Sequence, residues 1–342
     1  MADDERDRII RFLVARGADP AELGGTDLEL FETSMDVLYR PERPSLTIAQ
    51  VADRAQVTVD DVVQLWRAFG LQPPESGAVV LGEADVRLVT RLRDVSELFG
   101  PDAGLGMARV AGATMARLAD AGTSSFVTSQ ALPLVDGVVP FEQLEVNALV
   151  ADSLPNFMDA LETLFRRHLL VVRRTFESIE ELGPETQDLV VVFADLVDST
   201  GMAEELSLAD LSATIDRFEA TATDLIVGHG GRVAKFIGDE VMFVHGDADG
   251  AIDAALGLLT AEGMPPMRVG VDAGSVLTRD GDFFGPVVNV AARATSLASM
   301  GSILTTEAVA SRLDARFEPE ARGSLPVQGV GSVSFWEISP GR

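Results

Sequence analysis

The sequence of 342 residues is long enough for two domains, since one domain commonly takes about 100–200 residues. Its 46% hydrophobic and 24% charged residues are ordinary for a globular protein with a buried core. A formal net charge of −27 disfavours nucleic acids and anionic membranes as partners, and the absence of cysteine excludes disulfides and thiolate metal sites.

The start of the chain gives no targeting signal. Residues 1–8 are mostly charged and lack the apolar centre of a signal peptide. No apolar run approaches the ~20 residues that span a membrane. We therefore expect no membrane span and a cytoplasmic location.

The first half of the chain has the periodicity of amphipathic helices. Apolar residues recur at helical spacing in 4–17, 27–39 and 84–99, and another helix begins near Phe141. This pattern predicts an all-helical N-terminal domain over residues 1–156.

Residues 45–70 have the pattern of a helix–turn–helix module, as in bacterial DNA-binding regulators. The second helix begins Val59-Asp60-Asp61 and holds Arg67 as its one cation. Acid at the N-terminal end of a recognition helix opposes phosphate, so the pattern favours a packing module. DNA binding stays open as an alternative.

The segment 104–121 is rich in Ala, Gly, Met and Val and has few charges. A helix that is apolar on most sides is typical of a protein core or a dimer seam. We expect a buried helix here, and a pocket for an apolar ligand is the alternative.

A long amphipathic helix continues from Phe157 to about Leu182, with arginines interleaved among apolar residues. We interpret 157–185 as a helical linker that also self-associates. Gly183-Pro184-Glu185 ends it and predicts a domain boundary, with a second domain over 186–342.

The second domain mixes strands and helices. The predicted elements are a buried strand at 189–194, a helix at 203–227, a hairpin at 232–244, a helix at 249–259 and a strand at 267–271. This β-α-β-β-α-β order predicts an α+β, ferredoxin-like core. A helix at 289–299 and strands at 302–305 and 332–338 follow as additions.

Two aspartates stand where predicted strands end. Asp195 follows the buried strand, and Asp239 lies in the hairpin turn. If the strands are neighbours the carboxylates converge, and they suit Mg²⁺ or Mn²⁺ with phosphate oxygens completing the shell. Aspartate is also a common turn former, which is the alternative explanation.

Three further residues have chemistry suited to a nucleotide. Lys235 is the only lysine in the sequence, and arginine supplies the positive charge at other positions. A compact ammonium group at this one position therefore suggests a specific chemical need. Asn289 and Arg293 are spaced i and i+4, which puts both on one side of a helix. Arginine offers a planar fork for phosphate, and asparagine a donor and acceptor for a sugar.

The segments 193–200, 235–242 and 282–293 together resemble the catalytic domain of class III nucleotidyl cyclases, over about residues 186–339. The resemblance implies a role for each of the following residues. Two Mg²⁺ or Mn²⁺ ions would be held by Asp195, Asp239 and the backbone carbonyl of Leu196. Lys235 and Asp282 would recognise the adenine edge. Asn289 would orient the ribose, and Arg293 would stabilise charge on the α-phosphate.

The same resemblance implies a reaction and an assembly. The ribose 3′-hydroxyl of ATP would attack the α-phosphorus, giving 3′,5′-cyclic AMP and pyrophosphate. The site would be shared across a head-to-tail homodimer, with metal aspartates from one chain and base readers and arginine from the other.

One departure from the family pattern concerns the phosphates. A basic residue is common near the last hairpin, where this sequence has Gln328, and Arg322 is the possible substitute. A nucleotide-binding regulator without turnover is therefore the alternative from another functional class.

The N-terminal half more loosely resembles the helical regulatory region of mycobacterial cyclases of this class. The resemblance implies a domain that gates the catalytic dimer, in response to pH or to a bound fatty acid. His168 in the linker is the candidate proton sensor, and a solvated helix-face histidine is the alternative.

Overall fold

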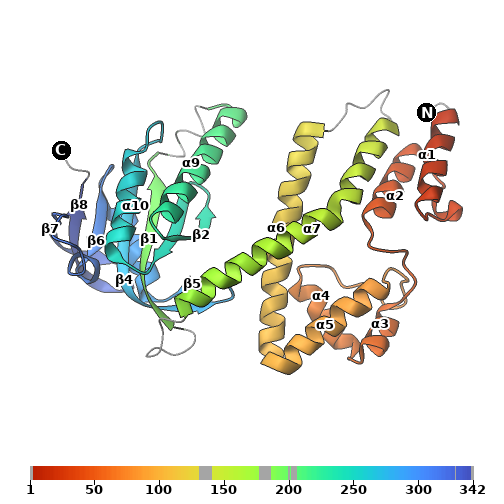
Figure 1. The fold of residues 1–342 in the computed structure, drawn as a ribbon, viewed down its shortest axis with the longest axis horizontal. Helices are drawn as coiled ribbons and strands as arrows, with labels where there is room; N and C mark the ends of the chain where they lie inside the picture. The colour runs from red at the N-terminus through yellow and green to blue at the C-terminus, as the bar shows by residue number, and fades with distance from the viewer. Residues whose placement is uncertain are drawn as a thin grey trace. The chain divides into compact units, whose positions relative to one another are not determined.

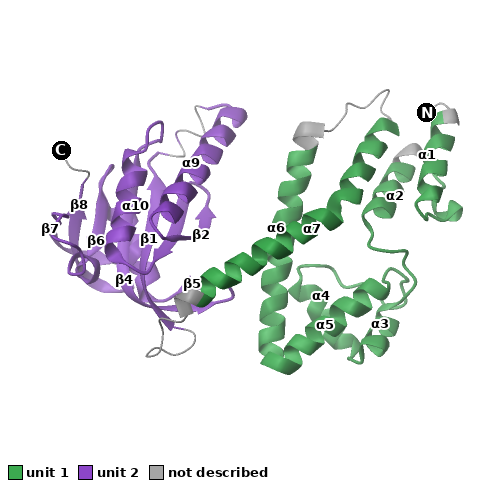
Figure 2. Ribbon diagram, viewed as in Figure 1, with its two compact units in different colours: residues 1–174 green, residues 175–342 purple. Residues whose placement is uncertain are grey.

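The computed structural model describes residues 3–130, 141–176, 186–198, 201, 206–327 and 329–339. The chain forms two compact units, Met1–Arg174 and Thr175–Arg342 (Figure 2). No described helix is long and apolar enough to cross a membrane.

The first unit is helical, which confirms the predicted all-α character. Its elements are α1 (Asp3–Ala15), the short 3-10 helix η1 (Pro20–Glu22), α2 (Asp27–Tyr39), α3 (Ile48–Ala55), α4 (Val59–Ala68), α5 (Glu83–Phe99), α6 (Pro101–Gln130) and α7 (Phe141–Phe176).

Two separate cores stabilise this unit. Leu13 of α1, Leu30 of α2 and Leu144 of α7 are almost fully buried in the first core. The second core joins α3, α4, α5 and α6 around Val51, Val62 and Val89, which have no exposed surface. Burial of apolar side chains of this size is the main favourable contribution to folding.

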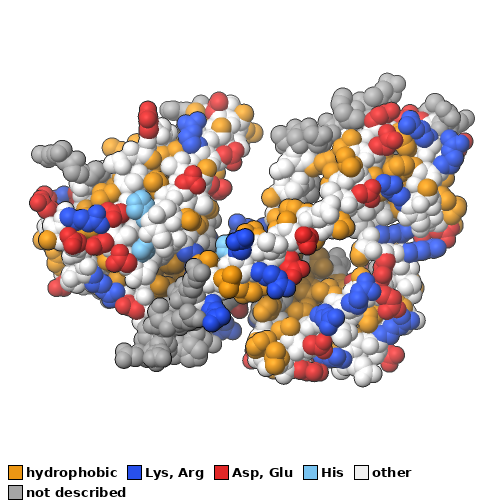
Figure 3. Space-filling model, in the orientation of Figure 1, with side chains coloured by type: hydrophobic (Ala, Val, Ile, Leu, Met, Phe, Trp, Pro, Cys, Tyr) orange, Lys and Arg blue, Asp and Glu red, His pale blue; other side chains and the backbone are white. Residues whose placement is uncertain are grey.

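The helix–turn–helix module is built on two capping boxes. Thr47 and Gln50 cap α3, and Thr58 and Asp61 cap α4 through reciprocal side-chain bonds. One of the two acids that begin the second helix is therefore needed for helix initiation. On the face drawn in Figure 3, acidic and basic side chains are interspersed.

The prediction that α6 is buried on most sides is wrong. Ala108 is fully buried, whereas Met107 is 54% and Met115 47% exposed. A methyl group added at Gly112 would lie 2.4 Å from the backbone of Phe69. The small residues of α6 therefore allow close packing along one side only, and the other sides are open.

Helix α7 has 36 residues and continues through Pro155. Its C-terminal half exposes more than half of the surface of Leu164, Phe165 and Leu170. His168 is also exposed. The predicted helix end near Leu182 and the boundary at 183–185 lie outside the described residues.

The second unit contains one mixed sheet with helices on both faces. Its elements are β1 (Thr186–Leu196), α9 (Leu208–Gly228), β2 (Arg232–Ile237), β3 (Glu240–His245), α10 (Ala248–Thr260), β4 (Met267–Arg279), β5 (Asp282–Phe284), α11 (Pro286–Leu297), β6 (Ile303–Thr306), α12 (Glu307–Ala310), β7 (Glu320–Val327) and β8 (Gly331–Ile338).

The strand order is β2-β3-β1-β4-β6-β8-β7, and β5 pairs with β4 (Figure 1). The predicted ferredoxin-like order β1-α9-β2-β3-α10-β4 is confirmed. The sequence patterns missed β5, β7 and α12, and they placed the end of β4 eight residues early, at Val271 instead of Arg279.

Each face of the sheet has its own core. Helices α9 and α10 cover one face, where Phe218, Phe243 and Ile252 are fully buried. Helix α11 covers the other face together with Phe283 of β5. A methyl group at Gly270 of β4 would lie 2.1 Å from the amide nitrogen of Thr295, so a glycine is needed for α11 to approach the sheet.

Candidate active site

Asp195 lies near the end of β1, the strand that runs between β3 and β4. Across the sheet it is directly opposite Glu240 on one side and Arg268 on the other. Its side chain is 16% exposed, because the buried run 189–194 carries it to the edge of the core. Three charged residues are thus aligned on neighbouring strands.

Arg268 binds Asp195 through two nitrogens. Nε and Nη2 of Arg268 donate to Oδ2 of Asp195 at 2.9 and 2.6 Å. Sequence reasoning missed this arginine, because its partner is 73 residues away in the chain. Only the pairing of β1 with β4 brings the two side chains together.

The second aspartate arrives through a tight turn. Gly238 and Asp239 join β2 to β3, and Gly238 has a φ of 65°, as the first position of a type II′ turn requires. The Leu196 amide donates to the Asp239 carbonyl at 3.2 Å. This bond brings the hairpin turn to the end of β1, as predicted for the two aspartates.

Glu240 adds a third carboxylate that the sequence did not reveal. Burial raises the pKa of Glu240 to about 7, and repulsion from Asp195 and Asp239 adds to this effect. Arg268 opposes the rise in pKa. The site thus has excess negative charge, which favours a bound cation.

These carboxylates fit a divalent metal. Asp195 and Asp239 supply hard oxygen ligands, and the guanidinium of Arg268 already neutralises one of these oxygens. Among the described residues, no group of three or more His, Cys, Asp or Glu side chains forms a complete metal site. Phosphate oxygens and water would therefore have to complete the shell.

Lys235 owes its direction to a bulge in β2. The pairing with β3 shifts between Val233 and Lys235, so that Lys235 lies opposite Met242, a buried residue of the α11 face. Without the shift, regular alternation would direct Lys235 to the same face as Val233. A β-bulge often re-aims a side chain next to an active site.

The bulge brings Lys235 to Asp282, the predicted partner in base recognition. Lys235 Nζ donates to Asp282 Oδ2 at 2.5 Å, and both side chains are 35% exposed. The amide of Phe283 donates to the other carboxylate oxygen at 2.8 Å. The guanidinium of Arg232 lies 4.9 Å from the centre of the Phe283 ring and supports this segment.

Asn289 and Arg293 lie on the exposed side of α11. Gly285 and Pro286 begin the helix, and buried Val290 and Ala294 fix which side faces the sheet. Among the described residues, neither side chain has a hydrogen bond or ion pair to Asp195 or Asp239.

The predicted phosphate contacts are less complete. Gln328 lies outside the described residues. Arg322, the possible substitute, donates to both carboxylate oxygens of Glu337 at 3.0 and 2.5 Å. This bidentate pair raises the pKa of Arg322 and argues against a guanidinium that is free for phosphate. Arg268 is paired with a carboxylate in the same way, but its partner is Asp195, one of the predicted site residues.

Several known proteins are similar to this chain in sequence. The sequence model of the adenylate and guanylate cyclase catalytic domain matches residues 183–340. An adenylate cyclase from Streptomyces coelicolor is 34% identical over 325 residues, covering 85% of this chain and 84% of that protein. This chain belongs to the adenylate and guanylate cyclase family. 

Other similar proteins match over both units. An uncharacterized Mycobacterium tuberculosis protein is 31% identical over 309 residues, covering 88% of this chain and 80% of that protein. A pH-sensitive adenylate cyclase from M. tuberculosis is 28% identical over 342 residues, with coverages of 93% and 82%. Among solved structures, the adenylyl cyclase CyaB from P. aeruginosa is 25% identical with a TM-score of 0.42, over 46% of this chain and 97% of that one.

Proposed function

We propose that this chain is an adenylyl cyclase that converts ATP into 3′,5′-cyclic AMP and pyrophosphate. The observation that carries the proposal is the 2.5 Å ion pair between Lys235 and Asp282. The only lysine of the sequence is held by a bulge against one carboxylate, which is an arrangement suited to reading a base edge.

The pair complements adenine chemically. The Asp282 carboxylate accepts a hydrogen bond from the exocyclic amino group, and Lys235 donates to a ring nitrogen. The Phe283 amide and Lys235 fix both carboxylate oxygens before the base arrives. Such pre-organisation lowers the ordering cost of binding.

Asp195 and Asp239 would hold two Mg²⁺ or Mn²⁺ ions. These ions, when bound, supply neutralising charge at the triphosphate and lower the pKa of the attacking hydroxyl. Arg268, which pairs with Asp195 through two nitrogens, would supply positive charge beside the phosphates.

The reaction is an internal phosphoryl transfer. The ribose 3′-oxygen forms a bond to the α-phosphorus, and the bond from this phosphorus to the bridging oxygen of pyrophosphate breaks. The proton of the 3′-hydroxyl passes to solvent and is balanced by protonation of the pyrophosphate that leaves. Asn289 orients the ribose, and Arg293 stabilises the charge that develops on the α-phosphate. Positioning and electrostatics provide the rate, as in other phosphoryl transfers.

A homodimer would complete the site. Both residue sets occur in this chain, yet no hydrogen bond or ion pair between described residues connects Asn289 or Arg293 to the metal aspartates. Sharing across two chains would give two sites per dimer. A monomer is expected to be inactive.

The helical unit would gate this activity. The matches to cyclases extend over both units, and one such relative is named as pH-sensitive. The test of gating compares the cyclase activity of the whole chain with that of residues 186–342 across pH 5.5–8. Identical dependence of activity on pH would contradict gating by the helical unit. A fatty-acid ligand of the helical unit stays a prediction. The exposed apolar side chains of α6 are the surface that such a ligand would contact.

The direct test of the activity is incubation of the whole chain with ATP and Mn²⁺ and chromatography of the products. We expect cyclic AMP from ATP, much less cyclic GMP from GTP, and neither from Asp195→Asn. A folded, dimeric protein that forms no cyclic AMP would contradict the proposal and favour a nucleotide-binding regulator.

A further inference from the structure

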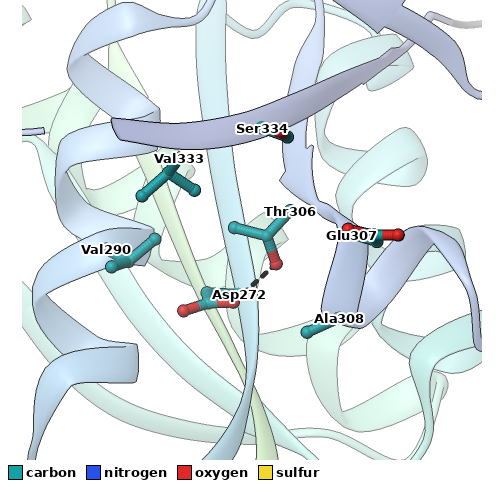
Figure 4. Close-up of a pocket in the computed structure, with 7 residues that line it drawn as sticks. All are labelled: Asp272, Val290, Thr306, Glu307, Ala308, Val333 and Ser334. Atoms are coloured by element: carbon teal, nitrogen blue, oxygen red, sulfur yellow. Dashed lines mark hydrogen bonds between the residues drawn. The ribbon is translucent and has the colours of Figure 1, made fainter. Parts of the chain in front are cut away.

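The catalytic unit has a pocket whose lining includes none of the residues assigned to the active site (Figure 4). Its volume of about 300 Å³ is at the lower end for small-molecule sites. Asp272 of β4, Val290 of α11, Thr306 at the end of β6 and Val333 of β8 contribute to the walls. Strands β4 and β6 are parallel, with α11 between them in sequence.

Asp272 is the chemically unusual residue of this pocket. It is only 8% exposed, and its Oδ1 accepts hydrogen bonds from the Ala273 amide at 2.9 Å and the Thr306 hydroxyl at 2.5 Å. Its Oδ2 accepts none from the described residues. In Figure 4 one oxygen points to Thr306 and the other points away from it, on the side of Val290.

Thr306 shows that the carboxylate is held in place. It is the N-cap residue of α12, yet its hydroxyl makes no capping bond to this helix. The hydroxyl donates to Asp272 instead. An N-cap side chain commonly accepts a hydrogen bond from its own helix. In Thr306 the hydroxyl instead orients the carboxylate of Asp272.

Asp272 forms no ion pair with any of the described residues. Burial raises its pKa, and the cation that opposes this effect, Arg312, is bound to Asp188 at 3.1 Å. Glu307 adds a second, exposed carboxylate to the pocket lining. Oδ2 of Asp272 is not one of the fully buried polar atoms that lack a partner, so solvent, or a cationic hydrogen-bond donor in its place, can reach this oxygen.

We propose that this pocket binds a small organic cation, an aliphatic primary amine whose ammonium group donates to Oδ2 of Asp272. The aliphatic part would pack against Val290 and Val333, and the Ser334 hydroxyl would contact a second polar end. Val290 follows Asn289 on α11, so an occupied pocket would also stiffen the helix that carries the ribose contact.

Calorimetric titration of the whole chain with 1,4-diaminobutane at low salt tests this site. We expect saturable binding with one amine per chain, and binding about tenfold or more weaker in Asp272→Asn because a charge-assisted hydrogen bond is lost. The neutral 1,4-butanediol should not bind. Glu262→Gln is the matched control, because this exposed carboxylate lies outside the pocket lining and should change the affinity by less than about threefold.

A second variant keeps the test decisive if Asp272→Asn unfolds. Val333→Phe fills the pocket without changing any charge and should also abolish binding. Equal amine affinity in the wild type and in a folded Asp272→Asn or Val333→Phe protein would overturn the proposal, as would the absence of saturable binding to the wild type. Binding is measured without ATP, so failure here is distinguishable from failure of the cyclase proposal.

Discussion

The two units of the chain differ in how completely they bury their apolar surface. In the sheet unit, strands such as β1 are covered on both faces, and Val191 and Val192 have no exposed surface. In the helical unit, α7 leaves Phe165 60% and Leu170 56% exposed. The polar residues of the sheet unit lie at strand ends and on the exposed side of α11, above a closed core. Exposed apolar surface such as that of α7 is typical of surfaces where proteins associate.

The largest effect is expected from the metal aspartates of the sheet unit. Asp195→Ala should lower cyclic AMP formation by about a hundredfold or more, since it removes charge stabilisation at the reacting phosphate. Far-UV circular dichroism should stay unchanged. Asp188→Ala, on the same strand but exposed and paired with Arg312, is the matched control and should keep nearly full activity.

Base recognition should give the next largest effect. Lys235→Ala should lower the kcat/KM for ATP by about tenfold to a hundredfold, as expected for loss of a charged hydrogen-bond donor. The ratio of ATP to GTP turnover should fall as well. Unchanged ATP preference in this variant would show that Lys235 and Asp282 form only a structural ion pair.

Substitutions in the helical unit should change the stability of the protein and not the chemical step. Gly112→Ala forces a methyl group against the backbone of Phe69 and should destabilise the unit by about 1–3 kcal/mol. Gly122→Ala, on the same helix with open space around it, should be neutral or stabilising. Thermal unfolding measures both, and equal midpoints would contradict the close packing of α6.

The smallest effect concerns the carboxylate whose pKa is raised to about 7, Glu240. A folded-state pKa above the unfolded value means that this group favours folding at low pH, and that the contribution is lost as pH rises through about 7. Without divalent ions, Glu240→Gln should therefore be more stable than the wild type at about pH 8, by about 1–2 kcal/mol after discounting for partial exposure.

Urea unfolding at several pH values measures the effect at Glu240. The difference between variant and wild type should shrink toward pH 5, and Asp188→Asn should show no such trend. A constant difference over this range would mean that the carboxylate at position 240 does not titrate as described.

Local sequence patterns predicted the parts of the fold that depend on local chemistry. The amphipathic helices and the Gly238-Asp239 turn follow from residue types and spacing, whereas the pairing of Lys235 with Asp282 was implied only by the resemblance to a family. The edge strand β7 was missed because it contains Gly323 and Pro326, which weaken any strand pattern.

Tertiary context explains what the sequence could not predict. The bulge that directs Lys235 and the pairing that joins Arg268 to Asp195 are properties of strand register. In α6, small apolar residues indicated burial, whereas in the fold they allow close approach on one side. Composition alone does not distinguish these two uses of small residues.

Mixing two inactive variants tests the central claim most directly. Asp239→Ala and Arg293→Ala should each be inactive as homodimers, because each breaks both shared sites. When their subunits exchange freely, half of the dimers carry one intact site, and about a quarter of the wild-type rate should return. A mixture of exchanging, folded dimers that stays inactive, or either variant retaining wild-type activity alone, would contradict a cyclase site shared between two copies of this chain.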